Sequence, residues 1–262
     1  MDNEYLREWH EICLPSLGVH YGDKLPAGRL KITPWTVAQE EAIARNSENR
    51  QDDLTHELLK SNVAWPEGFA YEDMLLTDQF FALLQLRVIS FLDFMTLTHS
   101  CPQCGDQHPV EVKLNNITIR TPDETDPDEP YSCFLPKRKV KIELRQQRVG
   151  DLLAAERYLK SAITTAPELR RKFLYARQIV SVGGESAKFD EKMHFVSTLA
   201  LLDLNAITNV IEKNSTGYRG TYTVECPQCK TQDERWVPPI HEDFFRPKST
   251  DVARACQLAE QD

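Results

Sequence analysis

Helical spacing of the apolar residues predicts a mainly helical N-terminal region. Leucines recur on one face of residues 52–63, and the apolar side chains of residues 77–93 are spaced so that they cover a helix almost all round. The first pattern is typical of an amphipathic helix and the second of a helix that is buried on most sides. We therefore expect residues 77–93 to form the central helix of the fold. A capping box between Thr36 and Gln39 predicts the start of another helix, which ends near Arg45.

The spacing changes to alternation at two places, and both contain the four residues CPQC. Residues 94–114 and 221–239 each have the pattern of a strand, a tight turn with CPQC, and a second strand. Alternation also predicts short strands at residues 30–33 and 139–145. The chain therefore makes the same hairpin twice, far apart in the sequence.

The segment between the two CPQC copies is predicted to be mostly helical. Helical spacing covers residues 151–163, 167–182, 190–202 and 203–213, whereas the acidic, proline-rich stretch from Thr121 to Pro130 reads as an exposed loop or linker. Residues 1–30 are interrupted by prolines and glycines and read as an irregular arm with a few apolar anchors. The domain organisation predicted from these patterns is an N-terminal arm and helical region at 1–98, a first hairpin at 99–120, an acidic linker with a strand and an inserted helical subdomain at 121–220, and a second hairpin with a C-terminal tail at 221–262.

Paired cysteines give the two hairpins a shared chemistry. Each CPQC turn directs two thiolates at one point, and a tetrahedral zinc site with four thiolates needs two such turns. We expect one structural Zn²⁺ per chain in a zinc ribbon, with four ligands: Cys101, Cys104, Cys226 and Cys229. The predicted fold class is α+β: a mainly helical protein with a zinc-ribbon-like pair of β-hairpins whose two CPQC knuckles flank a helical insertion.

Other uses of these cysteines stay open. A different ligand set could include His99, His108 or His241, and a lone CxxC could be a redox pair, although a thioredoxin-type site needs the motif at a helix N-terminus. The three remaining cysteines have no partner at ligand spacing and are expected to be ordinary buried or surface thiols: Cys13, Cys133 and Cys256.

Composition disfavours some partners. The 262 residues carry a formal net charge of −9, so non-specific binding to nucleic acid or to an anionic membrane surface is disfavoured. The basic cluster from Lys137 to Lys141, with Arg145 and Arg148, is the best nucleic-acid candidate, but its alternation with apolar residues favours a solvated sheet face. The most apolar run, residues 80–97, contains Gln, Arg and Asp and is not expected to span a bilayer. The acidic N-terminus shows no secretion signal.

The sequence lacks the familiar catalytic motifs. It has no phosphate-binding glycine loop, no HExxH and no GxSxG, and a four-thiolate zinc site offers no open position for water. Asp73 and Asp78 flank the central helix, and a helix cap is the favoured interpretation of Asp78. We therefore expect no enzymatic activity.

The order of these features resembles the baseplate hub protein family of T-even-like contractile-tailed bacteriophages. The resemblance covers most of residues 12–150 and continues at the second knuckle. The segments that carry it are LPSLGVHY (14–21), WTVAQEE (35–41), LTHELLKSNV (54–63), DMLLTDQFFALLQLRVISF (73–91) and the CPQCG that begins at Cys101.

The resemblance implies a protein that acts by contact. It would be a component of the baseplate hub at the end of the tail, or an assembly chaperone of the hub, with other hub proteins and the tape-measure protein as partners. It would lie in the host cytoplasm during assembly or in the tail baseplate of the virion. Two other classes remain as alternatives: a zinc-ribbon protein that binds nucleic acid or is associated with transcription, and an enzyme with an unrecognised site. A steep salt dependence of DNA binding would favour the first alternative.

Overall fold

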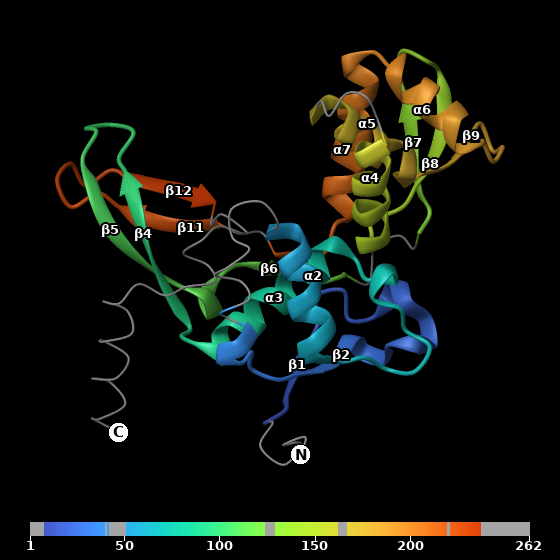
Figure 1. The fold of residues 1–262 in the computed structure, drawn as a ribbon. Coiled ribbons are helices and arrows are strands. Elements are labelled where there is room, and N and C mark those ends of the chain that lie inside the picture. The colour runs from blue at the N-terminus through green and yellow to red at the C-terminus, as the bar shows by residue number, and fades with distance from the viewer. Residues whose placement is uncertain are drawn as a thin grey trace.

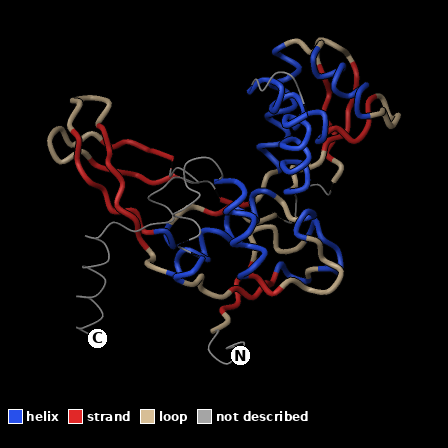
Figure 2. The backbone as a smooth tube through the Cα atoms, in the orientation of Figure 1, coloured by secondary structure: helices blue, strands red, loops and turns tan. Residues whose placement is uncertain are grey.

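The elements of the computed structural model form three groups in space (Figure 1). The structure describes residues 8–39, 41, 51–123, 129–161, 167–218 and 221–236. A central body holds the N-terminal elements, two long hairpins project from one side of it, and a lobe of helices around a small sheet lies on the other side. The tips of the two hairpins project away from the helices, and the base of the first hairpin reaches the central body (Figure 2).

The central body is built around the predicted central helix. Helix α3 (Leu76–Ser90) has buried residues on almost every side, among them Leu83, Leu84 and Leu86, each with 0% exposure. It packs with helix α2 (Gln51–Asn62) and with a three-stranded antiparallel sheet in the order β1 (His10–Cys13), β2 (Arg29–Ile32), β3 (Val63–Ala64). The predicted capping box is confirmed, because Thr36 N donates to Gln39 Oε1 over 2.8 Å and residues 37–39 are helical.

The N-terminal segment is more ordered than its prolines and glycines suggested. It contains strand β1 and two short 3₁₀ helices, Val19–Lys24 and Pro26–Gly28. Leu14 and Ser16 are completely buried. Gly18 has φ +77, and a Cβ at that position would lie 2.2 Å from Leu25 O, so only glycine fits this close turn. The described part of this segment therefore contains short regular elements and buried anchors, and it is not irregular throughout.

Two hairpins carry the CPQC turns as expected. Strands β4 (Phe94–Ser100) and β5 (Gln107–Lys113) pair along their whole length, and so do β11 (Thr221–Glu225) and β12 (Gln232–Trp236). A 3₁₀ turn (Leu114–Asn116) follows β5, and another (Tyr71–Asp73) precedes α3. The base of the first hairpin joins the main core through Met95, Leu97 and Val112.

A short two-stranded ladder joins the segment that leaves the first hairpin to the segment that leads into the second hairpin. Strand β6 (Ile119–Arg120) pairs with β10 (Gly217–Tyr218), although about a hundred residues separate them in the sequence. Arg120 donates to Ser215 O over 3.1 Å beside this ladder. The helical lobe thus begins and ends at neighbouring positions.

The lobe is a three-stranded antiparallel sheet covered by helices. The sheet order is β7 (Tyr131–Leu135), β8 (Val140–Leu144), β9 (Ile179–Val182), and the helices are α4 (Val149–Ser161), α5 (Pro167–Gln178), α6 (Phe189–Ser197) and α7 (Leu201–Asn214). Two sequence interpretations were wrong here. The helix predicted to reach Val182 ends at Gln178, because Ile179, Ser181 and Val182 pair with β8 and the β-branched residues of this segment favour a strand. Strand β7 was not predicted.

Two apolar cores hold the lobe together. One lies between the sheet and α7, around Ile142, Leu144 and Ile207, and the other lies among α4, α5 and α6, around Ala155 and Phe173. Among the described helices, none alone has the length and apolar composition of a membrane span. Helices α6 and α7 meet both criteria only when taken together across a bend of 120°.

Candidate metal centre

The four thiols of the CPQC turns converge at the tips of the two hairpins. Cys101 Sγ lies 3.5 Å from Cys229 Sγ, and Cys104 Sγ lies 3.6 Å from Cys226 Sγ. All four sulfur atoms lie within 4.8 Å of one another, and none of them is in a disulfide. The structure therefore brings together all four residues that the sequence predicted as ligands.

Matching backbone turns direct the thiols inward. In the first knuckle Gly105 N donates to Cys101 O, and Cys101 N donates to Asp106 O, both over 2.9 Å. In the second knuckle Lys230 N donates to Cys226 O over 2.9 Å, and Cys226 N donates to Thr231 O over 3.0 Å. The residue after each second cysteine is left-handed, with φ 73 at Gly105 and φ 60 at Lys230. The two copies of CPQC thus have the same local geometry.

One side of the cluster is closed and the other faces solvent. Cys101 and Cys226 are 3% and 1% exposed, Cys229 is half-buried and Cys104 is exposed. The inner pair is covered by the hairpins themselves, and Val224 beside it is also buried. The more exposed thiols, Cys104 and Cys229, give an ion a route to the cluster from solvent.

Neighbouring groups shift the pKa values of two of the thiols. Cys229 Sγ lies 3.3 Å from Thr231 Oγ1, and hydrogen bonds with the side chain and backbone of Thr231 lower the pKa of the Cys229 thiol to about 6. A hydrogen bond with the Asp106 backbone lowers the pKa of Cys104, but desolvation and the three neighbouring thiols outweigh it and raise that pKa to about 12. Closely spaced thiols resist ionising together unless a cation offsets their charge.

The donor set fits a tetrahedral ion. Four bonds of about 2.3 Å from zinc to sulfur place the sulfur atoms about 3.8 Å apart, and the two closest pairs here are 3.5 and 3.6 Å apart. Four thiolates suit Zn²⁺ and leave no open coordination position, so such a site can hold two hairpins together but cannot activate water.

Two histidines and two aspartates surround the cluster. His99 on β4 lies directly opposite His108 on β5, with their ring centroids 5.2 Å apart. His108 Nδ1 lies 3.0 Å from Asp106 Oδ2, and His99 Nε2 lies 3.8 Å from Asp233 Oδ2 on β12. Sequence reasoning considered both histidines but missed the aspartates, for which the only signal was the closeness of Asp106 to the first knuckle. His241 and Cys256 lie outside the described residues, Cys13 is exposed, and Cys133 is buried.

The basic residues of the lobe make internal contacts. Arg138 donates to Thr198 O over 2.9 Å, and Arg145 holds Asp151 through two hydrogen bonds of 2.8 and 2.7 Å. Arg148 donates to Asp73 O over 2.9 Å and lies 3.1 Å from Glu129 Oε2. These contacts give the three arginines of the basic cluster a structural use.

The prediction that Asp78 caps the central helix was wrong. The N-cap residue of α3 is Leu75, with no side-chain cap bond. Asp78 is 0% exposed; it accepts a hydrogen bond from Ser16 N over 3.1 Å and another from the Tyr21 hydroxyl over 2.5 Å. The carboxylate therefore ties the N-terminal segment to the central helix.

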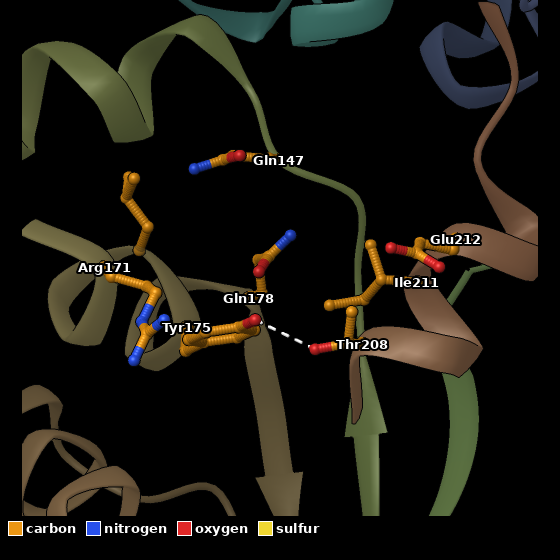
Figure 3. Close-up of a pocket in the computed structure, with 8 residues that line it drawn as sticks. Gln147, Arg171, Tyr175, Gln178, Thr208, Ile211 and Glu212 are labelled. Carbon is orange, nitrogen blue, oxygen red and sulfur yellow. Dashed lines mark hydrogen bonds between the residues drawn. The ribbon is translucent and has the colours of Figure 1, made fainter. Parts of the chain in front are cut away.

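Apart from the thiol cluster, the lobe has a pocket between α5 and α7 (Figure 3). This pocket has a volume of about 270 Å³, and Tyr175 and Thr208 form a 2.9 Å hydrogen bond across it. Its lining combines apolar side chains such as Leu174 and Ile211 with the charged ends of Arg171 and Glu212. The described residues that line it include no cysteine or histidine, and the pocket is separate from the metal centre.

Comparison with known protein families gives a match. A family model described as "T4 bacteriophage base plate protein" matches residues 19–246. No curated protein and no solved structure matches the chain. The matched range includes the central body from residue 19 onward, both knuckles and the whole helical lobe.

Proposed function

Because the chain belongs to the T4 bacteriophage base plate protein family, we propose that it is a component of the baseplate hub or an assembly chaperone of the hub and tape-measure protein. Membership in this family implies a structural, non-enzymatic role in the tail baseplate of the virion, with other baseplate components as partners. The family match over residues 19–246 is the observation that carries the proposal. The hub assignment follows from the resemblance of residues 14–91 to hub proteins.

We further propose that the scaffold is stabilised by one zinc ion held by four ligands: Cys101, Cys104, Cys226 and Cys229. The convergence of the four thiols supports this proposal. Because the ligands come from both sides of the helical lobe, the free energy of metal binding would add to the stability of the whole arrangement. Elemental analysis of purified protein should give about one zinc ion per four-thiolate site. Metal-free native protein with four freely titratable thiols would refute the proposed zinc site.

Exposed apolar side chains support a function by contact. Leu17 and Val19 in the N-terminal segment are 41% and 51% exposed, and Leu201 and Leu202 at the start of α7 are 77% and 50% exposed. Exposed apolar residues that cluster in sequence are typical of protein-binding surfaces when they are not covered by their own chain. We propose that the N-terminal segment contributes to docking on other tail proteins.

Co-expression with the hub and tape-measure proteins of the same phage tests the function. Full-length protein should capture at least one of them, and Leu17→Asp with Val19→Asp should weaken the capture while the chain stays folded. Lys188→Asp, a change in the lobe far from this segment in the sequence, serves as the control. Mass spectrometry of purified particles then separates a hub component, which stays in the virion, from an assembly chaperone, which leaves. Capture of neither protein, together with DNA binding that weakens steeply with salt, would replace the proposal with the nucleic-acid alternative.

A further inference from the structure

A second group of metal-binding atoms lies beside the four thiols. A carboxylate oxygen of Asp106, a ring nitrogen of His108 and the sulfur of Cys226 all lie within 4.8 Å of one another. Asp106 and His108 follow the first knuckle, whereas Cys226 belongs to the second, so this group also joins the two hairpins. Only Cys226 is shared with the four-thiol cluster.

The imidazole in this group has a polar atom without a partner. His108 Nε2 is buried and has no hydrogen-bond partner among the described residues. Leaving a buried polar atom without a partner costs about 1–3 kcal/mol, and such an atom in a native protein often indicates an ion or a water.

The charge around the cluster also calls for another cation. Four thiolates with one Zn²⁺ keep a net charge of about −2, and the carboxylate of Asp106 adds to it. Two basic residues of the second hairpin are engaged with acidic residues of the same hairpin: Lys230 lies 3.7 Å from Glu225 and Arg235 lies 2.5 Å from Asp233. Cys226, which lies beside Asp106 and His108, is 1% exposed, so water does little to offset the negative charge there.

We propose that Asp106, His108 and Cys226 bind a second divalent transition-metal ion, with the Cys226 thiolate bridging it to the ion in the four-thiolate site. This inference rests on the proposed zinc centre. Carboxylate, imidazole and thiolate are all established zinc ligands, and three protein ligands leave a fourth position for water. The Asp106 side chain is 31% exposed, which gives the ion access from solvent.

Cobalt binding tests the proposal, because Co²⁺ bound to thiolates has intense charge-transfer absorption that Co²⁺ bound to oxygen and nitrogen lacks. Full-length metal-free protein would be titrated with Co²⁺, dialysed and analysed for cobalt content. Wild type should hold two ions per chain. Asp106→Asn and His108→Gln should each hold one ion and keep the four-thiolate absorption, which also shows that the variant hairpins are folded. His99→Gln, a change at the neighbouring cross-strand position, should keep both ions.

The outcomes separate this inference from the proposed zinc centre. In one outcome the wild-type protein holds one ion, and its four-thiolate absorption reaches its maximum at one equivalent of Co²⁺. This result overturns the second site and leaves the zinc centre in place. Wild-type protein with neither thiolate absorption nor retained cobalt overturns both. A second ion that survives both Asp106→Asn and His108→Gln also overturns this ligand set.

Discussion

Single polar residues fix how distant segments of this chain meet. Asp78 lies on a largely apolar helix and is completely buried, yet its two partners are 57 and 62 positions away. Tyr21 in turn accepts a hydrogen bond from Leu75 N over 2.9 Å, so one carboxylate and one phenol organise the start of α3. Sequence alone suggested a helix cap, because a carboxylate in a first helical turn is most often used locally. The long-range use depends on the fold and leaves no local pattern.

Replacing Asp78 should loosen the N-terminal segment. Asp78→Ala leaves Ser16 N and the Tyr21 hydroxyl buried without an acceptor, so we expect a loss of about 2–4 kcal/mol in the free energy of unfolding. Tyr21→Phe removes one of these hydrogen bonds and should cost less, about 1 kcal/mol. Urea denaturation of both variants measures the difference. Equal stability of Asp78→Ala and wild type would show that this carboxylate does not anchor the segment.

Asp151 makes the lobe sensitive to acid. Its carboxylate is 1% exposed; it accepts hydrogen bonds from Arg145 and from Arg177 Nε, the latter over 2.8 Å. Burial alone would raise its pKa, but the two arginines and the Arg148 backbone N–H together lower it below the ordinary value of 3.8. Because the folded-state pKa is the lower one, the carboxylate stabilises the fold above about pH 4, and this contribution is lost as the pH falls through the folded-state pKa.

Asp151→Asn should therefore destabilise most at neutral pH. We expect a loss of about 2–3 kcal/mol at pH 7, somewhat below the cost of breaking a fully buried pair because both arginines are partly exposed. The difference from wild type should shrink as the pH is lowered from about 5 to about 3. Denaturation curves at several pH values measure this, with the exposed Asp23→Asn as control. A difference that stays constant with pH would contradict the assignment.

At the scale of single elements, local patterns predicted what local contacts determine. Helix α3, helix α2 and both knuckle hairpins were predicted near their observed bounds, since their apolar spacing and tight turns are contained within each segment. Strands β7 and β9 were missed. Residues 179–182 continue a helical pattern without a break, and only their pairing with β8 makes them a strand. The two-residue strands β6 and β10 are too short to give any pattern.

The contact between β10 and α3 should tolerate no side chain at Gly217. This residue has φ +108, and a Cβ there would lie 2.6 Å from Thr77 Cβ at the start of α3. Gly217→Ala should cost about 2–3 kcal/mol through steric overlap and backbone strain. Gly22→Ala is the matched control, because Gly22 also has a positive φ (+57) but an added Cβ there would meet nothing within 4 Å. Thermal unfolding of both variants checks the prediction, which fails if the two lose equal stability.

At the scale of the whole molecule, one cluster joins the ends of a long insertion. The repeated CPQC allowed its four cysteines to be identified from the sequence, because ligand spacing is a local property that appears twice. The contacts of His99 with Asp233, and of Asp106 and His108 with Cys226, could not be assigned in the same way, since they depend on how the two hairpins lie against each other.

Cys226→Ser should therefore affect the first hairpin as well as its own. With three thiolates the proposed zinc binds more weakly, and β4–β5 loses its attachment to β11–β12. Amide hydrogen exchange should become at least several-fold faster in residues 94–113, and a chelator added to wild type should have the same effect. Cys13→Ser, an exposed thiol outside the cluster, is the control. Unchanged exchange in the first hairpin would mean that the cluster does not hold the hairpins together.

The long separation of the two knuckles also has a consequence during synthesis. Cys104 and Cys226 are 122 positions apart, so a ribosome that adds about 5–20 residues per second makes the second knuckle roughly 6–24 s after the first. In that interval the nascent chain has only two of the four thiols, and any ion it picks up can exchange freely. A chain that stops before residue 226 never completes the cluster. Tight retention of the proposed zinc ion would therefore distinguish finished chains from unfinished ones.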